Sequence, residues 1–286
     1  MYLFTTLDKI NKKIIYESFI EAFSDYSVNI FLPYEDFEKM LIGKGFNSEI
    51  SIGLFHEEKL IGFILNGKRE WNGKKTAYDM GTALLTSYRG YGFSKKMIKE
   101  ILKLLKEKNV EQYLLEVIQD NKNAFELYKA HDFKISRDFS VFQLKKNSCI
   151  PSASIPYKIE TVSEISDNMW EIFKTFWDFS PSWQNSINSV KAVKEVFSYV
   201  IVKDKNNIIG YGIIEKNSGK IPQLAVDKNY RNKNIGKNII NRLTSCTDGD
   251  FIKFINIDRK CENIEKFLKS LNFEISSLQY EMMLEI

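Results

Sequence analysis

Two glycines, Gly90 and Gly92, stand between an apolar strand-like segment and an amphipathic helical segment in the stretch 86–96. Glycine has no Cβ and adopts positive φ readily, so the backbone N–H groups of such a turn can converge at the start of the helix. This arrangement suits a phosphate or a pyrophosphate. A plain strand-to-helix turn uses the same residues, because a short glycine motif is common.

A carboxylate and a phenol downstream of this turn can move protons. In the predicted strand 113–118, the alternation of side chains places Glu116 on one face together with Leu114 and Ile118. Burial among apolar groups raises the pKa of a carboxylic acid and suits it to act as a general base. Tyr128, whose free phenol has a pKa of about 10, can supply a proton. An ion pair for Glu116 and ordinary packing for Tyr128 are the alternatives.

The elements that must position these groups follow from the apolar periodicity. Strand-like patterns cover residues 50–55, 60–65, 77–85 and 113–118, and a final strand pair runs to residue 144. Helical spacing covers residues 9–23, 94–108 and 122–129. The turn therefore opens the helix 94–108, whereas Glu116 lies on the next strand and Tyr128 on the helix after it.

The second half of the chain repeats this order of elements. Strands are predicted at 198–202, 208–214, 221–226 and 251–257, with helices around 235–243 and 263–270. Tyr230-Arg231 aligns with Tyr88-Arg89, which indicates an internal duplication. Prolines and serines interrupt the patterning at 145–156, and a length of 286 residues suits two domains of roughly 150 residues each. We predict the domains 1–147 and 148–286.

Composition and charge exclude several classes of protein. Hydrophobic residues make up 44% and charged residues 27%, as in ordinary globular proteins. The 41 basic and 37 acidic residues interleave, without the clustered basic footprint of a nucleic-acid-binding protein. No segment approaches the roughly 18 apolar residues of a membrane span, and the start lacks a secretory pattern. Three cysteines without metal-site spacing predict no metal. We expect a cytoplasmic protein without nucleic acid or membrane partners.

Two motifs together resemble the GNAT (Gcn5-related) N-acetyltransferase family. Residues 89–94 match the pattern Arg/Gln-x-x-Gly-x-Gly/Ala, with Ser94 in place of the usual Gly or Ala. The family's Asn-x-x-Ala-x-x-Leu-Tyr segment is matched by Asn121, Ala124, Leu127 and Tyr128, while Asp132 replaces a glycine. The resemblance implies an α/β (α+β) fold with two tandem GNAT-like acyl-CoA N-acyltransferase domains. Each would be a mixed, mostly antiparallel twisted sheet flanked by helices.

The resemblance also implies a cosubstrate, acetyl-CoA, and the residues that bind it. Leu84 and Leu85 would contact the pantetheine arm through main-chain groups, and Asn121 would line it. The pyrophosphate would be held by Arg89, Gly90, Tyr91, Gly92, Phe93 and Ser94. Glu116 would take a proton from a primary amine, and Tyr128 would protonate the thiolate of coenzyme A. No Cys or Ser in the motifs has a base nearby, so the transfer is predicted to be direct.

The acceptor lies beyond what these motifs define. Asp25, Tyr26 and the segment 34–36 occupy the place of the family's variable acceptor loops, where acidic groups suit a cationic amine. Small-molecule and peptide amines both stay open as acceptors. A homodimer stays open as well.

The second half resembles the same family only in outline. Asn234 stands in place of the first glycine of the pattern Arg/Gln-x-x-Gly-x-Gly/Ala, and Asn256 and Leu268 align with Glu116 and Tyr128. We therefore predict that the second domain is degenerate or supporting. Its aromatic segment, with Trp170, Phe173 and Trp177 on one helical face, is predicted to be a core stripe, with an acceptor-lining patch as the alternative.

Two rival hypotheses remain. In the first, the chain is a non-catalytic acyl-CoA-binding regulatory protein. In the second, the C-terminal domain carries out the chemistry.

Overall fold

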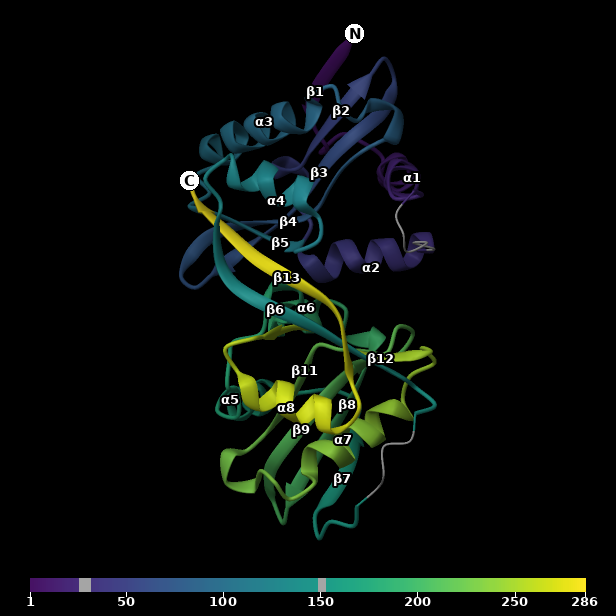
Figure 1. Cartoon of the computed structure of the whole chain (residues 1–286), viewed down its shortest axis with the longest axis vertical. Coiled ribbons are helices and arrows are strands. Elements are labelled where there is room, and N and C mark those ends of the chain that lie inside the picture. The colour runs from purple at the N-terminus through teal and green to yellow at the C-terminus, as the bar shows by residue number, and fades with distance from the viewer. Residues whose placement is uncertain (26–31, 149–152) are drawn as a thin grey trace. The chain divides into compact units, whose positions relative to one another are not determined.

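The computed structural model describes residues 1–25, 32–148 and 153–286, which form two compact units (Figure 1). Unit 1 contains residues 1–137 and 280–286, and unit 2 contains residues 138–279. The predicted linker 145–156 lies partly outside the described residues. The two units coincide only in part with the predicted domains, because the last seven residues of the chain belong to unit 1.

Unit 1 is a sheet flanked by helices. Its strands lie in the order β1 (Tyr2–Thr6), β2 (Ile52–His56), β3 (Lys59–Trp71), β4 (Lys74–Leu84) and β5 (Gln112–Ile118). The first four pair antiparallel, while β4 and β5 pair parallel. The helices are α1 (Lys12–Ala22), α2 (Tyr34–Lys44), α3 (Phe93–Glu107) and α4 (Lys122–Lys129), with short 3₁₀ turns η1 (Ser48–Ile50) and η2 (Thr86–Tyr88).

The longest helix, α3, shows why the apolar periodicity predicted this fold. Its buried residues are spaced so that one face meets the sheet, and they are Phe93, Met97, Ile98, Ile101 and Leu105. Figure 1 shows α3 and α4 as the two helices that follow β4 and β5 in the chain. The helix α2 was not predicted, although Phe37 and Leu41 on it are buried at helical spacing.

The two central strands of unit 1 pair over only part of their length. The register runs from Thr76 opposite Gln112 to Asp79 opposite Leu115, whereas β4 continues to Leu84. Beyond Asp79 the two strands are no longer hydrogen-bonded to each other. This opens a gap in the sheet on the side where the glycine turn follows β4.

Unit 2 repeats the plan with a wider break. A four-stranded sheet has the order β11 (Gln223–Val226), β9 (Asn207–Glu215), β8 (Phe197–Asp204) and β7 (Lys158–Val162). A second ladder joins β10 (Lys220–Ile221) to β12 (Phe251–Asp258). The predicted strand 221–226 is therefore interrupted at Pro222, which has no backbone N–H to donate.

Helices and aromatic residues complete unit 2. The helices are α5 (Asp167–Lys174), α6 (Ile187–Ala192), α7 (Ile235–Thr244) and α8 (Glu262–Ser270), and the 3₁₀ turns are η3 (Trp183–Asn185), η4 (Lys194–Val196) and η5 (Lys228–Tyr230). Trp170 and Phe173 on α5 are buried in a core cluster, as the core-stripe prediction requires. Trp177 lies beyond the end of α5 and is only partly buried.

Two long strands are each divided between the units. The first, β6 (Lys134–Lys145), begins in unit 1, and its residues from Phe139 onward pair antiparallel with β12 of unit 2. The second, β13 (Glu274–Glu285), begins in unit 2 and ends in unit 1. There the amide of Ile286 donates to the carbonyl of Glu111 at 3.0 Å. Each unit therefore contains strand residues from the other half of the sequence.

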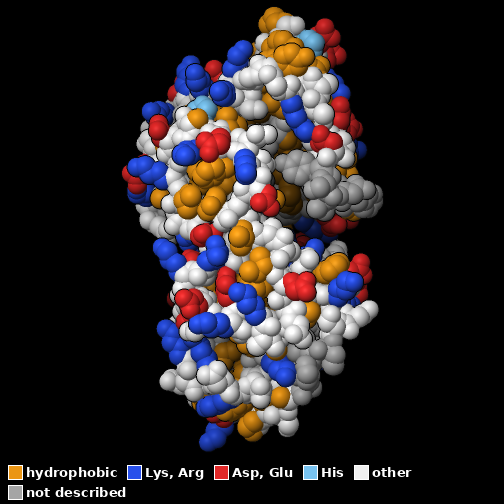
Figure 2. All heavy atoms as spheres, in the orientation of Figure 1, with side chains coloured by type: hydrophobic (Ala, Val, Ile, Leu, Met, Phe, Trp, Pro, Cys, Tyr) orange, Lys and Arg blue, Asp and Glu red, His pale blue; other side chains and the backbone are white. Residues whose placement is uncertain are grey.

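The charged side chains interleave on the face shown in Figure 2, as they do along the sequence. None of the helices in the described part of the chain combines the length and the hydropathy of a membrane span.

Candidate active site

The glycine turn of unit 1 has the backbone shape that a phosphate needs. Gly90 and Gly92 have φ of +84° and +77°, and Gly92 is the N-cap of α3. A Cβ at either position would meet no atom within 4 Å, so the positive φ alone, and not a lack of space, favours glycine there. The first N–H groups of a helix have no partner within the helix. The turn therefore presents an open set of donors at a helix N-terminus.

Arg89 fixes this turn rather than facing it. Its Nε donates to the carbonyl of Leu84 at 3.0 Å, and its Nη2 donates to the carbonyl of Ala22 at 2.7 Å. Its Nη1 donates to Asp25 at 2.5 Å. The guanidinium thus ties the end of α1 to the end of β4, and we call this set of bonds the arginine brace.

Asp25 belongs to this brace. The hydrogen bond from Arg89 lowers the pKa of the Asp25 carboxyl, so the side chain that was expected in an acceptor loop is paired with the turn. Tyr26, predicted for the same loop, lies outside the described residues. Tyr34, Glu35 and Asp36 form the first turn of α2.

The two leucines before the turn differ in what their main chains offer. The N–H of Leu85 donates to the carbonyl of Ile61 at 2.9 Å, within the pairing to β3. Alternate residues of a strand direct their N–H groups to opposite neighbours, so the N–H of Leu84 faces the gap beside β5. Of the two predicted pantetheine contacts, Leu84 has the suitable orientation.

The remaining predicted binding residues lie around the same turn. Tyr91 is 72% exposed, whereas Phe93 is buried and its ring packs on Tyr2. Ser94 is half-buried in the first turn of α3. Asn121 caps α4, where its side-chain oxygen accepts from the N–H of Ala124 at 3.1 Å. The capping bond fixes Asn121 directly after β5.

Glu116 is half-buried on β5 and is hydrogen-bonded to Tyr78 on β4. Burial, followed by the charge of Glu116 and this hydrogen bond, raises the pKa of Tyr78 far above its usual value. Of the two apolar neighbours predicted for Glu116, Leu114 is buried and Ile118 is 43% exposed. The carboxylate is therefore placed between a dry and a solvated region, just past the end of the β4–β5 pairing.

Tyr128 is buried on α4 and pairs with a residue that sequence analysis did not identify. Its hydroxyl donates to Oδ2 of Asp79 at 2.9 Å. Asp79 also accepts from the Thr82 hydroxyl at 2.6 Å and from the N–H of Gly81 at 2.9 Å. Burial raises the pKa of Asp79, although these three hydrogen bonds oppose the shift. The sequence did offer one signal for Asp79, because it is an acidic residue inside the apolar segment 77–85.

The two acid–phenol pairs lie on opposite faces of the sheet. Successive side chains of a strand alternate between faces, so Tyr78 and Asp79 point in opposite directions. The pair Tyr78–Glu116 therefore lies on one face, and the pair Asp79–Tyr128 lies on the other. A group lying in the gap between β4 and β5 would have a carboxylate and a phenol on either side.

Unit 2 repeats the arginine brace and the turn. Arg231 donates to the carbonyls of Val226 and Phe176 and to Asp178, at 3.2, 3.1 and 3.1 Å. The two glycines are replaced by Asn232 and Asn234, which have φ of +60° and +59°. Asparagine tolerates this left-handed region better than most residues. The second turn thus keeps the conformation of the first without its glycines.

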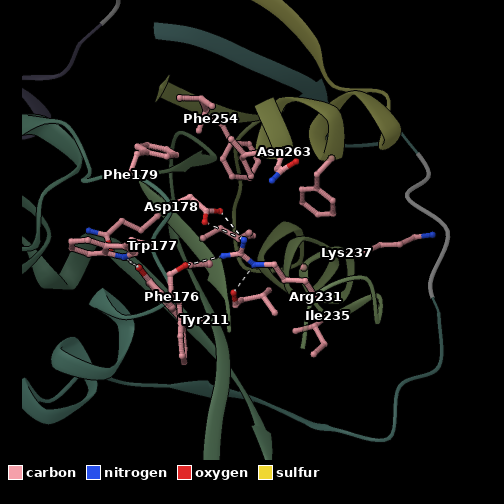
Figure 3. A pocket seen from close by; sticks show the side chains of 18 of the residues that line it. Phe176, Trp177, Asp178, Phe179, Tyr211, Arg231, Ile235, Lys237, Phe254 and Asn263 are labelled. Carbon is pink, nitrogen blue, oxygen red and sulfur yellow. Dashed lines mark hydrogen bonds and ion pairs between the residues drawn. The ribbon is translucent and has the colours of Figure 1, made fainter. Parts of the chain in front are cut away.

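A cavity of about 770 Å³ opens beside this second turn (Figure 3). It runs along β11 and β12 and is bounded by the brace residues Arg231 and Asp178. Figure 3 shows Trp177 and Phe179 on the side of the cavity opposite Lys237, whose side chain points outward. The aromatic segment 168–186 therefore contributes both to the core and to a cavity wall.

A chain of hydrogen bonds forms part of the cavity lining. Trp177 donates to the Tyr211 hydroxyl at 2.6 Å, Tyr211 donates to Gln223 at 2.8 Å, and Gln223 donates to the carbonyl of Asn185 at 2.7 Å. Among the described residues, the side-chain oxygens of Asn185 and Asn256 are buried without a hydrogen-bond donor. Buried acceptors normally have a partner, so these two suit a ligand that brings N–H or O–H groups.

Family models and solved structures identify the family and the fold. Residues 12–133 match the model described as "Acetyltransferase (GNAT) family", and residues 162–281 match the model described as "Acetyltransferase (GNAT) domain". The chain belongs to the GNAT acetyltransferase family. The resemblance inferred from residues 89–94 and 121–128 is thereby confirmed, together with the tandem α/β fold.

Three solved structures are similar to this GNAT chain over almost its whole length. A tandem GNAT protein from the clavulanic acid biosynthesis pathway, without AcCoA, has a TM-score of 0.74 at 9% identity, covering 100% of this chain and 98% of that one. A GCN5-related N-acetyltransferase from Sphaerobacter thermophilus has a TM-score of 0.73 at 10% identity, with coverages of 99% and 95%.

The third is a GCN5-related glucosamine N-acetyltransferase region of a fungal multi-domain β-N-acetylglucosaminidase. Its TM-score is 0.69 at 11% identity, with coverages of 99% and 38%. At such low identities, these TM-scores show a shared fold and nothing more. No curated protein matches the chain in sequence.

The two GNAT units differ most where the acid–phenol pairs lie. The carbonyls of Leu84 and Val226 each accept a hydrogen bond from the brace arginine of their unit, so these two residues are equivalent. Counting back along the strand from each of them pairs Asp79 with Ile221. The carbonyl of Tyr128 accepts a hydrogen bond from the N–H of Phe133 just after α4, and the carbonyl of Leu268 accepts one from the N–H of Phe273 just after α8. Tyr128 and Leu268 are therefore equivalent. A bulge at Asn256 adds one residue to β12, so Ile255 or Asn256 replaces Glu116. The aligned positions of unit 2 therefore hold none of these three titratable side chains.

Proposed function

We propose that unit 1 transfers an acetyl group from acetyl-CoA to a primary amine. The observation that carries this proposal is the pair of carboxylate–phenol contacts on either side of the gap beyond Asp79 and Leu115. Unit 2 has the same brace and turn but replaces Asp79, Glu116 and Tyr128 with residues that carry no titratable group.

The residues of unit 1 fit the cosubstrate in two places. The open donors of Gly90 to Ser94 would hold the pyrophosphate, because both the turn N–H groups and the helix dipole favour an anion. The N–H of Leu84 would bond the pantetheine arm, which adds to the sheet like a short strand. Acetyl-CoA supplies the activated acetyl thioester.

The chemistry needs one proton acceptor and one proton donor. Glu116 would remove a proton from the attacking ammonium group, directly or through one water. Tyr128 would protonate the thiolate from the opposite face of the sheet. Because the two groups lie on opposite faces, the amine and the leaving sulfur can be served at the same time.

The amine is supported by chemistry and by one structural neighbour. A half-buried carboxylate suits an acceptor that arrives as a cation and must lose a proton. The fungal neighbour is named a glucosamine N-acetyltransferase region, and glucosamine carries a primary amine. Small amines and peptide amines are both consistent with this acceptor class.

The test combines calorimetric titration of acetyl-CoA with a thiol-release assay over a panel of primary amines. Gly92→Pro should abolish binding in unit 1, because proline fixes φ near −65° whereas Gly92 has φ of +77°. Glu116→Gln should keep binding and reduce kcat by about 100-fold or more. Thiol release that Glu116→Gln leaves unchanged would contradict the proposal.

A second candidate function is favoured by the cavity in unit 2. There a coenzyme A derivative would bind without reacting, since the turn and the unpartnered oxygens of Asn185 and Asn256 match a phosphate and two amide N–H groups. Asn234→Pro is the matched variant to Gly92→Pro. A titration with two binding events, one lost in each variant, supports this function, whereas a single event lost only in Gly92→Pro contradicts it.

A further inference from the structure

In the buried pair Asp79–Tyr128, the charge of Asp79 determines whether Tyr128 can give up its proton. The hydroxyl of Tyr128 lies 2.9 Å from Oδ2 of Asp79, and both side chains are buried. A tyrosinate at this distance from an ionised carboxylate would be a buried pair of like charges, which is strongly unfavourable. Tyr128 can therefore act as an acid only if Asp79 does not carry its negative charge at that moment.

The surroundings of Asp79 favour its neutral form. Its carboxyl is fully buried, and this burial is the largest influence on its pKa, which it raises. The hydrogen bonds from Thr82, Tyr128 and Gly81 and the charge of Lys44 on α2 act in the opposite direction but do not reverse the shift. The other titratable group on its face of the sheet is Tyr113 on β5, which stays protonated because burial raises its pKa. Tyr78, the neighbouring residue on β4, points to the opposite face and also stays protonated because burial raises its pKa.

Unit 2 indicates that the pair is not needed for folding. Ile221 and Leu268 occupy the corresponding positions, and the helix and the arginine brace are kept around them, although the strand is interrupted at Pro222 directly after Ile221. An apolar pair therefore serves the fold. The polar pair in unit 1 has another role.

We propose that Asp79 is the proton reserve of unit 1, which donates its proton to the oxygen of Tyr128 while Tyr128 protonates the leaving thiolate. This inference rests on the proposed acetyl transfer in unit 1. Asp79 does not touch the reacting atoms, so it is a positioning residue that acts through Tyr128.

The protons and charges balance in one concerted step. In the structure the Tyr128 hydroxyl donates to Oδ2 of Asp79, so the relay requires this hydrogen bond to reverse: protonated Oδ2 donates to the Tyr128 oxygen, and the Tyr128 hydroxyl donates to the sulfur. The O–H bond of protonated Asp79 then breaks as a new O–H bond forms on Tyr128, and the original O–H bond of Tyr128 breaks as the S–H bond of coenzyme A forms. The negative charge moves from sulfur to the Asp79 carboxylate, and no tyrosinate accumulates. Solvent returns a proton to Asp79 before the next turnover.

The pH profile of kcat tests this relay. Protonated Asp79 is the active form, so kcat should fall as the pH rises through the pKa of Asp79, well below the titration of a tyrosine at about pH 10. Asp79→Asn keeps the side-chain shape but cannot supply the proton. It should lower kcat by about 100-fold, leave the KM for acetyl-CoA unchanged and abolish this limb of the profile.

Thr82→Val is the matched variant. It removes a hydrogen bond that lowers the pKa of Asp79, so the falling limb should move to higher pH while kcat at low pH is retained. A merely structural role for Asp79 would not move the limb. A limb that stays in place in both variants overturns the inference.

An infrared measurement separates this inference from the proposed function. At a pH below the falling limb of kcat, the full-length protein should show the band of a protonated carboxyl group that disappears in Asp79→Asn. If the wild-type protein releases thiol but lacks this band, the relay is wrong and the acetyl transfer stands. If the band is present but no amine is acetylated, the proposed function fails and the neutral Asp79 needs another use.

Discussion

The two turns at residues 86–94 and 228–236 have the same backbone arrangement but different side chains around them. Each follows a strand, passes through a 3₁₀ turn, is held by an arginine brace and enters a helix through left-handed residues. The first is flanked by Glu116, Tyr128 and Asp79, and the second by apolar or amide side chains. The comparison teaches that the conformation of the turn does not depend on the acid–phenol pairs beside it.

The largest expected effect comes from replacing the buried acid–phenol pair of unit 1 by the apolar pair found in unit 2. The double variant Asp79→Ile, Tyr128→Leu should lose thiol release by more than about 100-fold. Its free energy of unfolding should change by less than about 2 kcal/mol, because a well-packed apolar pair can replace a buried polar one. Leu268→Met in unit 2 is the volume-matched control and should keep full turnover. Unfolding of the double variant at room temperature would show that the comparison between the units is misleading.

The two arginine braces can be compared directly. Arg89→Ala and Arg231→Ala should each lower the free energy of unfolding by about 1–3 kcal/mol, since each removes charge-assisted bonds to two carbonyls and a carboxylate. The Arg231 side chain is 29% exposed and that of Arg89 is 39% exposed, so we expect the larger loss for Arg231. Urea unfolding measures both values. Equal and negligible losses would mean that the braces do not stabilise the turns.

A smaller effect is expected from exchanging the left-handed residue of one turn for that of the other. Gly92→Asn should keep acetyl-CoA binding and cost less than about 1 kcal/mol, because Asn234 adopts the same conformation in unit 2. Gly92→Ala should cost more than Gly92→Asn, since alanine lacks the local hydrogen bonding that makes asparagine tolerant. Calorimetry and thermal unfolding measure both. The reverse order of stability would contradict the equivalence of the turns.

The difference in stability between the wild-type protein and Asp79→Asn, followed against pH, should report the titration of Asp79. Its pKa is raised in the folded state above the ordinary value of 3.8. Such a group contributes stability that is fully present below the unfolded pKa and is lost as the pH rises through the folded pKa. Relative to Asp79→Asn, the wild-type protein should therefore become less stable as the pH rises from about 4 through that pKa. An unchanged difference across this range would contradict the raised pKa.

The sequence predicted the parts of the site that depend on local conformation. The glycines of the turn and the buried face of α3 are both determined by residues within a few positions of one another. The cap at Asn121 was not predicted. Asp79 was missed because its partner Tyr128 lies on another element, and strand alternation does not reveal which helix covers a buried acid.

The fold was predictable to the same extent. The duplicated order of strands and helices follows from apolar spacing, and the family models confirm it. The division of β6 and β13 between the units depends on pairing between residues far apart in the chain, for which periodicity carries no information. Pro222 offered a local signal for the break between β10 and β11, but the apolar run around it indicated one strand.

Unit 1 is not encoded by one continuous segment, because its last strand residues, 280–286, follow unit 2 in the chain. A gene fragment that stops at residue 147 would encode unit 1 without residues 280–286, leaving the edge of β5 near Glu111 unpaired and Lys74 without its ion pair to Glu285. Exposed strand edges promote aggregation. A linear cut between the two halves therefore removes strand residues from unit 1, and we expect the fragment 1–147 to aggregate more readily than the full chain.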